Sequence, residues 1–135
     1  MKTLMAFLIL ALLVVLQIRC SGEPGVFQTY FWTSTPGTEK LYVYVDGRRL
    51  GALPRLASAP DVRSDSLERV ALYTPLPSGS YRVEVKNDQG LLRVAETLEI
   101  SRRGGNMRLS TSFSDHQGNG KCVWNEDRLV EELTY

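Results

Sequence analysis

The chain has 135 residues, with 16 basic and 15 acidic side chains and a formal net charge of +1. A length of this order predicts one domain with a core large enough to form without disulfide staples. Charges of both signs are interspersed, so no long-range positive field would attract nucleic acid, and we expect no nucleic-acid partner.

The first residues differ sharply from the rest of the chain. An apolar stretch covers residues 4–18, interrupted only by Gln17 and preceded by Lys2. It is about 15 residues long, whereas a membrane-spanning helix needs about 20 and a signal peptide needs an apolar region of about 7–15. We therefore predict a signal peptide over residues 1–19, a tether over residues 20–25 and an exported domain over residues 26–135.

The end of the leader allows two outcomes. Residues 16–22 resemble a degenerate bacterial lipobox, in which Cys20 would become the first mature residue and carry lipid on its sulfur. The alternative is an ordinary cut before Glu23, since Cys20 and Gly22 supply small residues at positions −3 and −1. The first outcome predicts a lipoprotein anchored in the bacterial cell envelope, facing the periplasm or the cell surface. The second predicts a soluble periplasmic or secreted protein.

Strands are predicted directly after the tether. Residues 26–33 are dense in β-branched and aromatic side chains, and residues 41–45 alternate Leu, Tyr, Val, Tyr, Val. Asp46-Gly47 is a strong hairpin signal, with residues 48–53 as the returning strand. Residues 54–69 lack any period and contain many small or polar side chains, so we expect a loop insertion there.

The second half continues the pattern. Strands are predicted at residues 69–74, 81–86, 91–100, 107–113 and 121–124, with a tight turn at residues 75–80. Asn125 is a candidate N-cap for a short C-terminal helix whose apolar stripe would be Leu129, Val130 and Leu133. Several short strands joined by Gly-, Pro-, Asn- and Asp-containing turns predict an all-β fold, a small antiparallel β-sandwich.

Two motifs in the middle of the chain resemble a known family. Residues 43–51, Val-Tyr-Val-Asp-Gly-Arg-Arg-Leu-Gly, resemble the opening of a PEGA-type or related transthyretin-like sandwich module. Residues 76–85 resemble its hairpin of the form proline, small residue, glycine, x, tyrosine, and residues 98–100 would be its closing strand. The resemblance covers residues 41–100. It implies an accessory or binding module on an exported protein, without catalysis.

Four aromatic residues are candidates for ligand binding. Tyr30 and Trp32 share one face of a strand, as do Tyr42 and Tyr44. If both pairs point outward from adjacent strands, they form an aromatic platform suited to a glycan or a peptide. If they point inward, they belong to the core, which is the general tendency of such side chains.

The sequence offers little for catalysis or for metal binding. His116 is the single histidine, and its neighbours Ser114 and Asp115 lie beside it in a loop, where they do not form a catalytic triad. The two cysteines, Cys20 and Cys122, form no Cys-x-x-Cys motif, and His116 has no partner for a zinc site. We expect a non-enzymatic protein without metal or cofactor. Its expected partners are the membrane, through a lipid on Cys20, and an envelope protein or glycan.

Overall fold

The computed structural model describes residues 25–103, 106–113 and 121–135. The predicted signal peptide, Cys20 and His116 lie outside these residues. The described residues form one four-stranded sheet, in the order β4-β1-β9-β8, and one five-stranded sheet, in the order β3-β2-β5-β6-β7. The strands of the first sheet are β1 (Val26–Trp32), β4 (Leu72–Pro77), β8 (Lys121–Asn125) and β9 (Arg128–Glu132). Those of the second are β2 (Leu41–Val45), β3 (Arg48–Ala52), β5 (Gly79–Asn87), β6 (Leu92–Arg103) and β7 (Asn106–Phe113).

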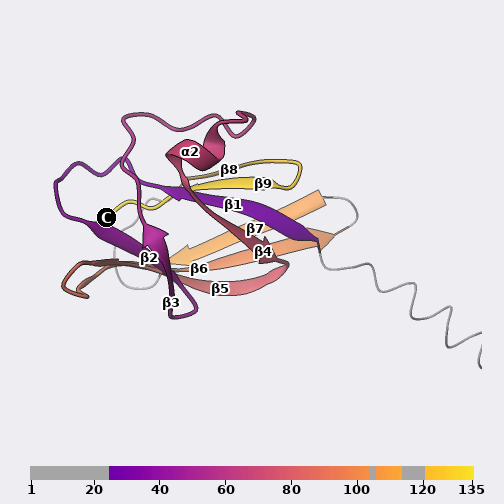
Figure 1. Cartoon of the computed structure of the whole chain (residues 1–135). Coiled ribbons are helices and arrows are strands. Elements are labelled where there is room, and N and C mark those ends of the chain that lie inside the picture. Colours follow the sequence, from indigo (N-terminus) through magenta and orange to yellow (C-terminus); the bar gives the residue numbers. More distant parts are fainter. Residues whose placement is uncertain (1–24, 104–105, 114–120) are drawn as a thin grey trace, which may run out of the picture.

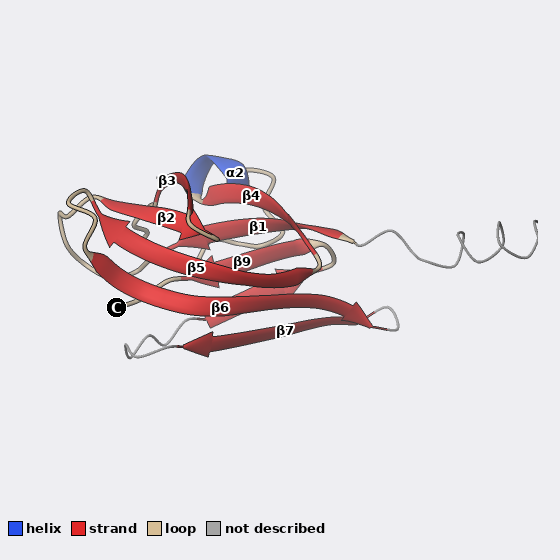
Figure 2. Cartoon of the chain, turned by 90° about the horizontal axis from the view of Figure 1, so that it is seen from below, coloured by secondary structure: helices blue, strands red, loops and turns tan. Residues whose placement is uncertain are grey.

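The two sheets pack face to face as a small β-sandwich, which confirms the predicted fold class (Figure 1). Strand pairs are antiparallel except for β1 and β9, which run parallel, with Phe31 opposite Glu131. Figure 2 shows β5, β6 and β7 running side by side through the second sheet.

Strand alternation builds the core. Every second residue of a strand points to the same face, so one set of apolar side chains from each sheet meets between the layers. The residues buried there are Phe27, Phe31, Leu41, Val43, Val45, Leu53, Leu76, Val83, Val85, Val94, Leu98, Ile100, Leu129 and Leu133. This interior layer is the shared hydrophobic core of both sheets.

The predicted Asp46-Gly47 hairpin is present. Asp46 has φ 48° and Gly47 has φ 79°, and left-handed backbone at both turn residues is what joins two twisted antiparallel strands tightly. The turn connects β2 to β3, with Val45 opposite Arg48. Asp46 also accepts a hydrogen bond on Oδ1 from the backbone N–H of Arg82, at 2.8 Å, which joins the turn to β5.

The tight turn predicted at residues 75–80 is wrong. β4 continues through Pro77, and β5 begins at Gly79, so only Ser78 separates the two strands. They lie in different sheets and do not pair, so the segment is a crossing between layers rather than a hairpin. Prolines are tolerated in β4 because it is an edge strand that pairs only with β1. Tyr81 Oη donates to the Pro77 carbonyl oxygen at 2.6 Å across this crossing.

The segment between β3 and β4 is a covering layer. It contains a short helix, α2 (Leu67–Val70), where the sequence predicted a loop followed by a strand from residue 69. Figure 1 shows this segment and α2 on the outer side of the sheet that holds β1 and β9. Leu67, Val62 and Ala71 pack there in a second cluster of buried side chains. We call residues 53–71 the cover segment.

The predicted C-terminal helix is also wrong. β8 and β9 form an antiparallel hairpin whose turn contains Glu126, with φ 54°. Leu129 and Leu133 point into the core, while Val130 belongs to the second cluster under the cover segment. β9 is therefore buried on both faces, and the apolar residues Leu129, Val130 and Leu133 do not alternate as they would on a half-buried strand, so their spacing resembles a helical stripe.

Candidate functional site

The four candidate aromatic residues do not form one platform. Tyr30 and Trp32 lie on β1, in the four-stranded sheet, and Tyr42 and Tyr44 lie on β2, in the five-stranded sheet. The platform required adjacent strands. The two pairs instead occupy the outer faces of different layers, so they cannot contact one ligand surface together.

Tyr30 and Trp32 are covered. Their side chains point away from the core but are only 2% and 3% exposed, because Val62 and Leu67 of the cover segment pack over them. The Tyr30 and Tyr73 rings lie 5.3 Å apart between centroids. Burial, followed by the nearby charge of Glu68, raises the pKa of Tyr30. This pair is a second packing layer rather than a binding surface.

Tyr42 and Tyr44 form a different surface. Val43 and Val45 point into the core, so the two tyrosines project from the opposite face of β2, where they are half-buried. The guanidinium carbon of Arg49 lies 3.6 Å from the centroid of the Tyr42 ring. Lys86 Nζ lies 4.9 Å from the centroid of the Tyr44 ring. Each ring therefore supports a cation at cation–π distance.

The carboxylate of Glu84 forms ion pairs with two cations of this surface. Glu84 accepts from Arg82 Nε and from Lys86 Nζ, both at 3.2 Å. Burial raises the pKa of Glu84, but the hydrogen bonds from Lys86 and Arg82 outweigh it and hold the pKa below its ordinary value. We call this surface the tyrosine face; its residues are Tyr42, Tyr44, Arg49, Arg82, Glu84 and Lys86. Cations outnumber anions on it.

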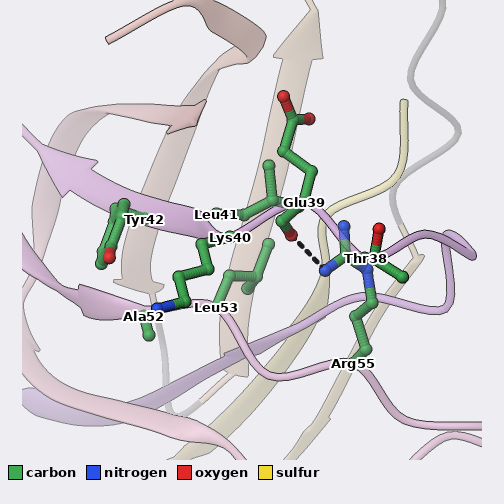
Figure 3. Close-up of a pocket in the computed structure, with 8 residues that line it drawn as sticks. All are labelled: Thr38, Glu39, Lys40, Leu41, Tyr42, Ala52, Leu53 and Arg55. Carbon is green, nitrogen blue, oxygen red and sulfur yellow. Dashed lines mark hydrogen bonds between the residues drawn. The ribbon is translucent and has the colours of Figure 1, made fainter. Parts of the chain in front are cut away.

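A pocket of about 410 Å³ adjoins the tyrosine face at Tyr42. Its other lining residues are Thr38, Glu39, Lys40, Leu41, Ala52, Leu53 and Arg55 (Figure 3). Its volume falls within the usual range for small-molecule sites. Figure 3 shows Lys40 extending toward Ala52, while the Glu39 carboxylate points away from Arg55.

Arg55 forms one wall of this pocket. Its Nε donates to the Thr35 carbonyl oxygen at 3.1 Å, Nη1 donates to the Glu39 carbonyl oxygen, and Nη2 donates to Tyr135 Oη at 3.2 Å. These bonds use three of the five guanidinium N–H groups. The positive charge of Arg55 is therefore held in place by backbone and phenol oxygens rather than by a carboxylate.

A second pair of ionisable groups lies in the interior, away from the tyrosine face. Glu96 and Glu131 are buried within hydrogen-bonding range of one another. The paired carboxyl groups of glycosidases are about 5 Å or more apart and face a cleft. Neither glutamate lines the pocket beside Tyr42.

Within the described ranges, no cluster of His, Cys, Asp and Glu side chains could hold a metal ion. Nor does any helix in that part of the chain have the length and apolar character needed to cross a membrane.

Comparisons of the chain with protein-family models, with curated proteins and with solved structures found no match. The resemblance of residues 41–100 to PEGA-type modules therefore stays a prediction.

Proposed function

We propose that this chain is an exported, lipid-anchored β-sandwich of the bacterial cell envelope with a non-catalytic binding role. Export is supported by the apolar stretch over residues 4–18, and anchoring by the position of Cys20 directly after it. The alternative, a soluble periplasmic or secreted binding module, follows if the leader is cut before Glu23.

The binding role is carried by one observation, the cations stacked over the rings of Tyr42 and Tyr44. A guanidinium held flat against a ring keeps its in-plane N–H groups available for a carboxylate or a phosphate. Arg49 is exposed, and Lys86 lies across β2 from it, so the two cations present a short row of positive charge.

An extended anionic glycan fits this surface best. Tyr42 belongs both to the tyrosine face and to the adjoining pocket, where Lys40 and Arg55 add positive charge. A polymer with regularly spaced carboxylates can contact Lys86, Arg49 and the pocket in succession. We therefore propose an acidic envelope glycan as the ligand, with the acidic peptide as the alternative.

Isothermal titration of the purified protein with alginate oligosaccharides tests this proposal, with dextran oligosaccharides as the neutral comparison. The double variant Arg49→Gln/Lys86→Gln should bind alginate about tenfold more weakly or worse, because hydrogen bonds to charged groups are the stronger ones. The matched control is Arg69→Gln, an exposed cation on α2 over the other sheet.

Alginate binding that weakens with salt and is lost only in the double variant supports the proposal. Equal binding of dextran and alginate, or equal loss in Arg69→Gln, contradicts it. Binding of poly-glutamate without alginate binding replaces the glycan with an acidic peptide.

A further inference from the structure

Two glutamates face each other inside the core. Glu96 lies on β6 between the core residues Val94 and Leu98, and Glu131 lies on β9 between Leu129 and Leu133. Strand alternation therefore directs both side chains into the layer between the sheets. Glu96 is 2% exposed and Glu131 is 1% exposed.

Among the described residues, no other group donates a hydrogen bond to the two carboxyl groups. All four of their oxygen atoms are buried, and none receives a hydrogen bond from a donor group in the described part of the chain. The two groups nevertheless lie within hydrogen-bonding range of one another. Two ionised carboxylates cannot form a hydrogen bond with each other, because neither carries a proton to donate. The contact becomes a hydrogen bond only when the pair holds at least one proton.

Among the side chains that the structure describes on the neighbouring strands, none supplies a compensating positive charge to the pair. On β1, Phe27 and Phe31 are apolar, and the buried hydroxyl of Thr29 donates to the Phe27 carbonyl oxygen at 3.4 Å. On β5, Val83 and Val85 are buried in the core, and the neutral phenol of Tyr81 packs against it while its Oη donates to the Pro77 carbonyl oxygen. The β7 residue at the register position opposite Glu96 is Phe113.

Cys122 of β8 is a further ionisable group near the pair. It lies opposite Glu131 in the β8–β9 register and packs against the core. Burial raises the pKa of its thiol strongly, and the charges of Glu131 and Glu96 raise it further. Cys122 therefore stays neutral and cannot offset a negative charge on either carboxyl group.

The same burial acts on the two glutamates. It raises the pKa of Glu131 well above the ordinary value, with the contact to Glu96 adding to the effect. Burial also raises the pKa of Glu96, and the hydrogen bond with Glu131 offsets only part of that rise. Two buried carboxyl groups in contact repel each other strongly when both are ionised. The pair therefore retains a proton at pH values where exposed glutamates have lost theirs.

We propose that Glu96 and Glu131 form a proton-dependent clasp between the two sheets, closed while they share a proton and opened when it is lost. β6 lies next to the edge strand β7, and β9 lies next to the edge strand β8. Each glutamate therefore lies one strand away from an edge of its sheet. This inference concerns the fold and does not depend on the proposed ligand.

The sign of the effect follows from linkage. A carboxyl group whose pKa is raised on folding contributes its full stability below the ordinary value of 4.5, and loses it as pH rises through the raised pKa. Glu39 and Glu84 have lowered pKa values, so their contribution is lost as pH falls below that value. Above about pH 5, the contribution of Glu39 and Glu84 is therefore constant, whereas the contribution of the clasp falls as pH rises.

Urea unfolding of the purified protein between pH 5 and pH 8 tests the clasp. The wild-type unfolding equilibrium constant should rise with pH, by about tenfold per pH unit for each proton released. The double variant Glu96→Gln/Glu131→Gln has no titratable carboxyl group at either position, so this pH dependence of unfolding should be lost. Glu99→Gln, an exposed glutamate on the same strand, is the matched control and should retain it. Equal pH dependence in the wild type and the double variant would overturn the proposal.

A direct titration keeps the test valid if the double variant does not fold. In wild-type protein carrying ¹³C-labelled glutamate, two side-chain carboxyl resonances should titrate at clearly higher pH than the others. Their absence from Glu96→Gln and Glu131→Gln single variants would assign them. If every glutamate carboxyl group of the wild type titrates near 4.5, the clasp does not exist.

Discussion

The half-buried carboxylate of Glu39 connects the start of β2 to β5 and β6. It lies just before β2 and accepts from Arg93 of β6 at 2.8 and 3.1 Å, and from Asn87 of β5 at 2.7 Å. Its backbone carbonyl oxygen accepts from Arg55. The hydrogen bonds from Arg93, followed by the one from Asn87, lower the pKa of this carboxyl group.

The substitution Glu39→Gln should destabilise the fold at pH 7 by no more than a few-fold in the unfolding equilibrium constant, because the pair is near the surface. A lowered pKa contributes stability that is present above 4.5 and lost as pH falls through the folded-state value. Urea midpoints of wild type and variant should therefore converge in acid. A difference that grows in acid would contradict this reading, and Glu99→Gln serves as the control.

The contact between Glu96 and Glu131 could not be predicted from the sequence. Alternation in residues 94–100 places Glu96 on the same face as Leu98 and Ile100. It cannot show that a second carboxyl group faces Glu96, because Glu131 arrives from a strand that the apolar pattern predicted as a helix. A pairwise contact between sheets leaves no local signal in either segment.

Among the elements, the cover segment decides the fate of the first aromatic pair. Leu67 of α2 is fully buried and packs in the cluster that contains Tyr30 and Trp32. The sequence of the cover segment has no regular spacing of apolar residues, so its packing role could not be predicted. The aromatic density of residues 26–33 was enough to predict a strand, but not which layer would cover it.

Replacing Leu67 with alanine should loosen this cover, because a buried Leu→Ala change typically costs about 2–5 kcal/mol. The chain has two tryptophans, Trp32 and Trp124, so Trp124→Phe leaves Trp32 as a single fluorescence probe. In that background, Leu67→Ala should shift the Trp32 emission to longer wavelength and raise quenching by acrylamide. Val70→Ala, on the exposed side of α2, should leave both unchanged. An unchanged spectrum in the Leu67 variant would show that the segment does not shield Trp32.

The position of β4 at a sheet edge explains one further difference from prediction. Pro75 and Pro77 are common turn signals, yet an edge strand accommodates them because one side of β4 needs no ladder bonds. The hairpin at Asp46-Gly47 was predictable because its turn chemistry is local. The β2–β3 connection was therefore predictable from its own residues. The β4–β5 connection was not, because it depends on the assignment of the two strands to different sheets.

The first and last strands of the described residues are neighbours in one sheet. β9 pairs in parallel with β1, so the last strand completes the sheet that the first strand begins. The sequence predicted a β-sandwich from strand spacing, and the structure confirms it. It could not predict the strand order, because pairing between residues about a hundred positions apart is set by packing across the whole core.

This arrangement also bears on the proposed anchor. β1 begins at Val26, so a lipid on Cys20 would be joined to the sheet by residues 20–25. A chain of that length spans at most about 20 Å when fully extended. We therefore expect an anchored sandwich to lie close to the membrane surface.

The intact mass of the mature protein, from the membrane and soluble fractions of a bacterial host, tests the proposed lipid anchor directly. We expect a membrane-bound species that begins at Cys20 and carries added acyl mass, and that disappears in Cys20→Ser. A soluble species that begins at Glu23 without added mass would contradict the lipid anchor and favour a diffusible periplasmic or secreted binder.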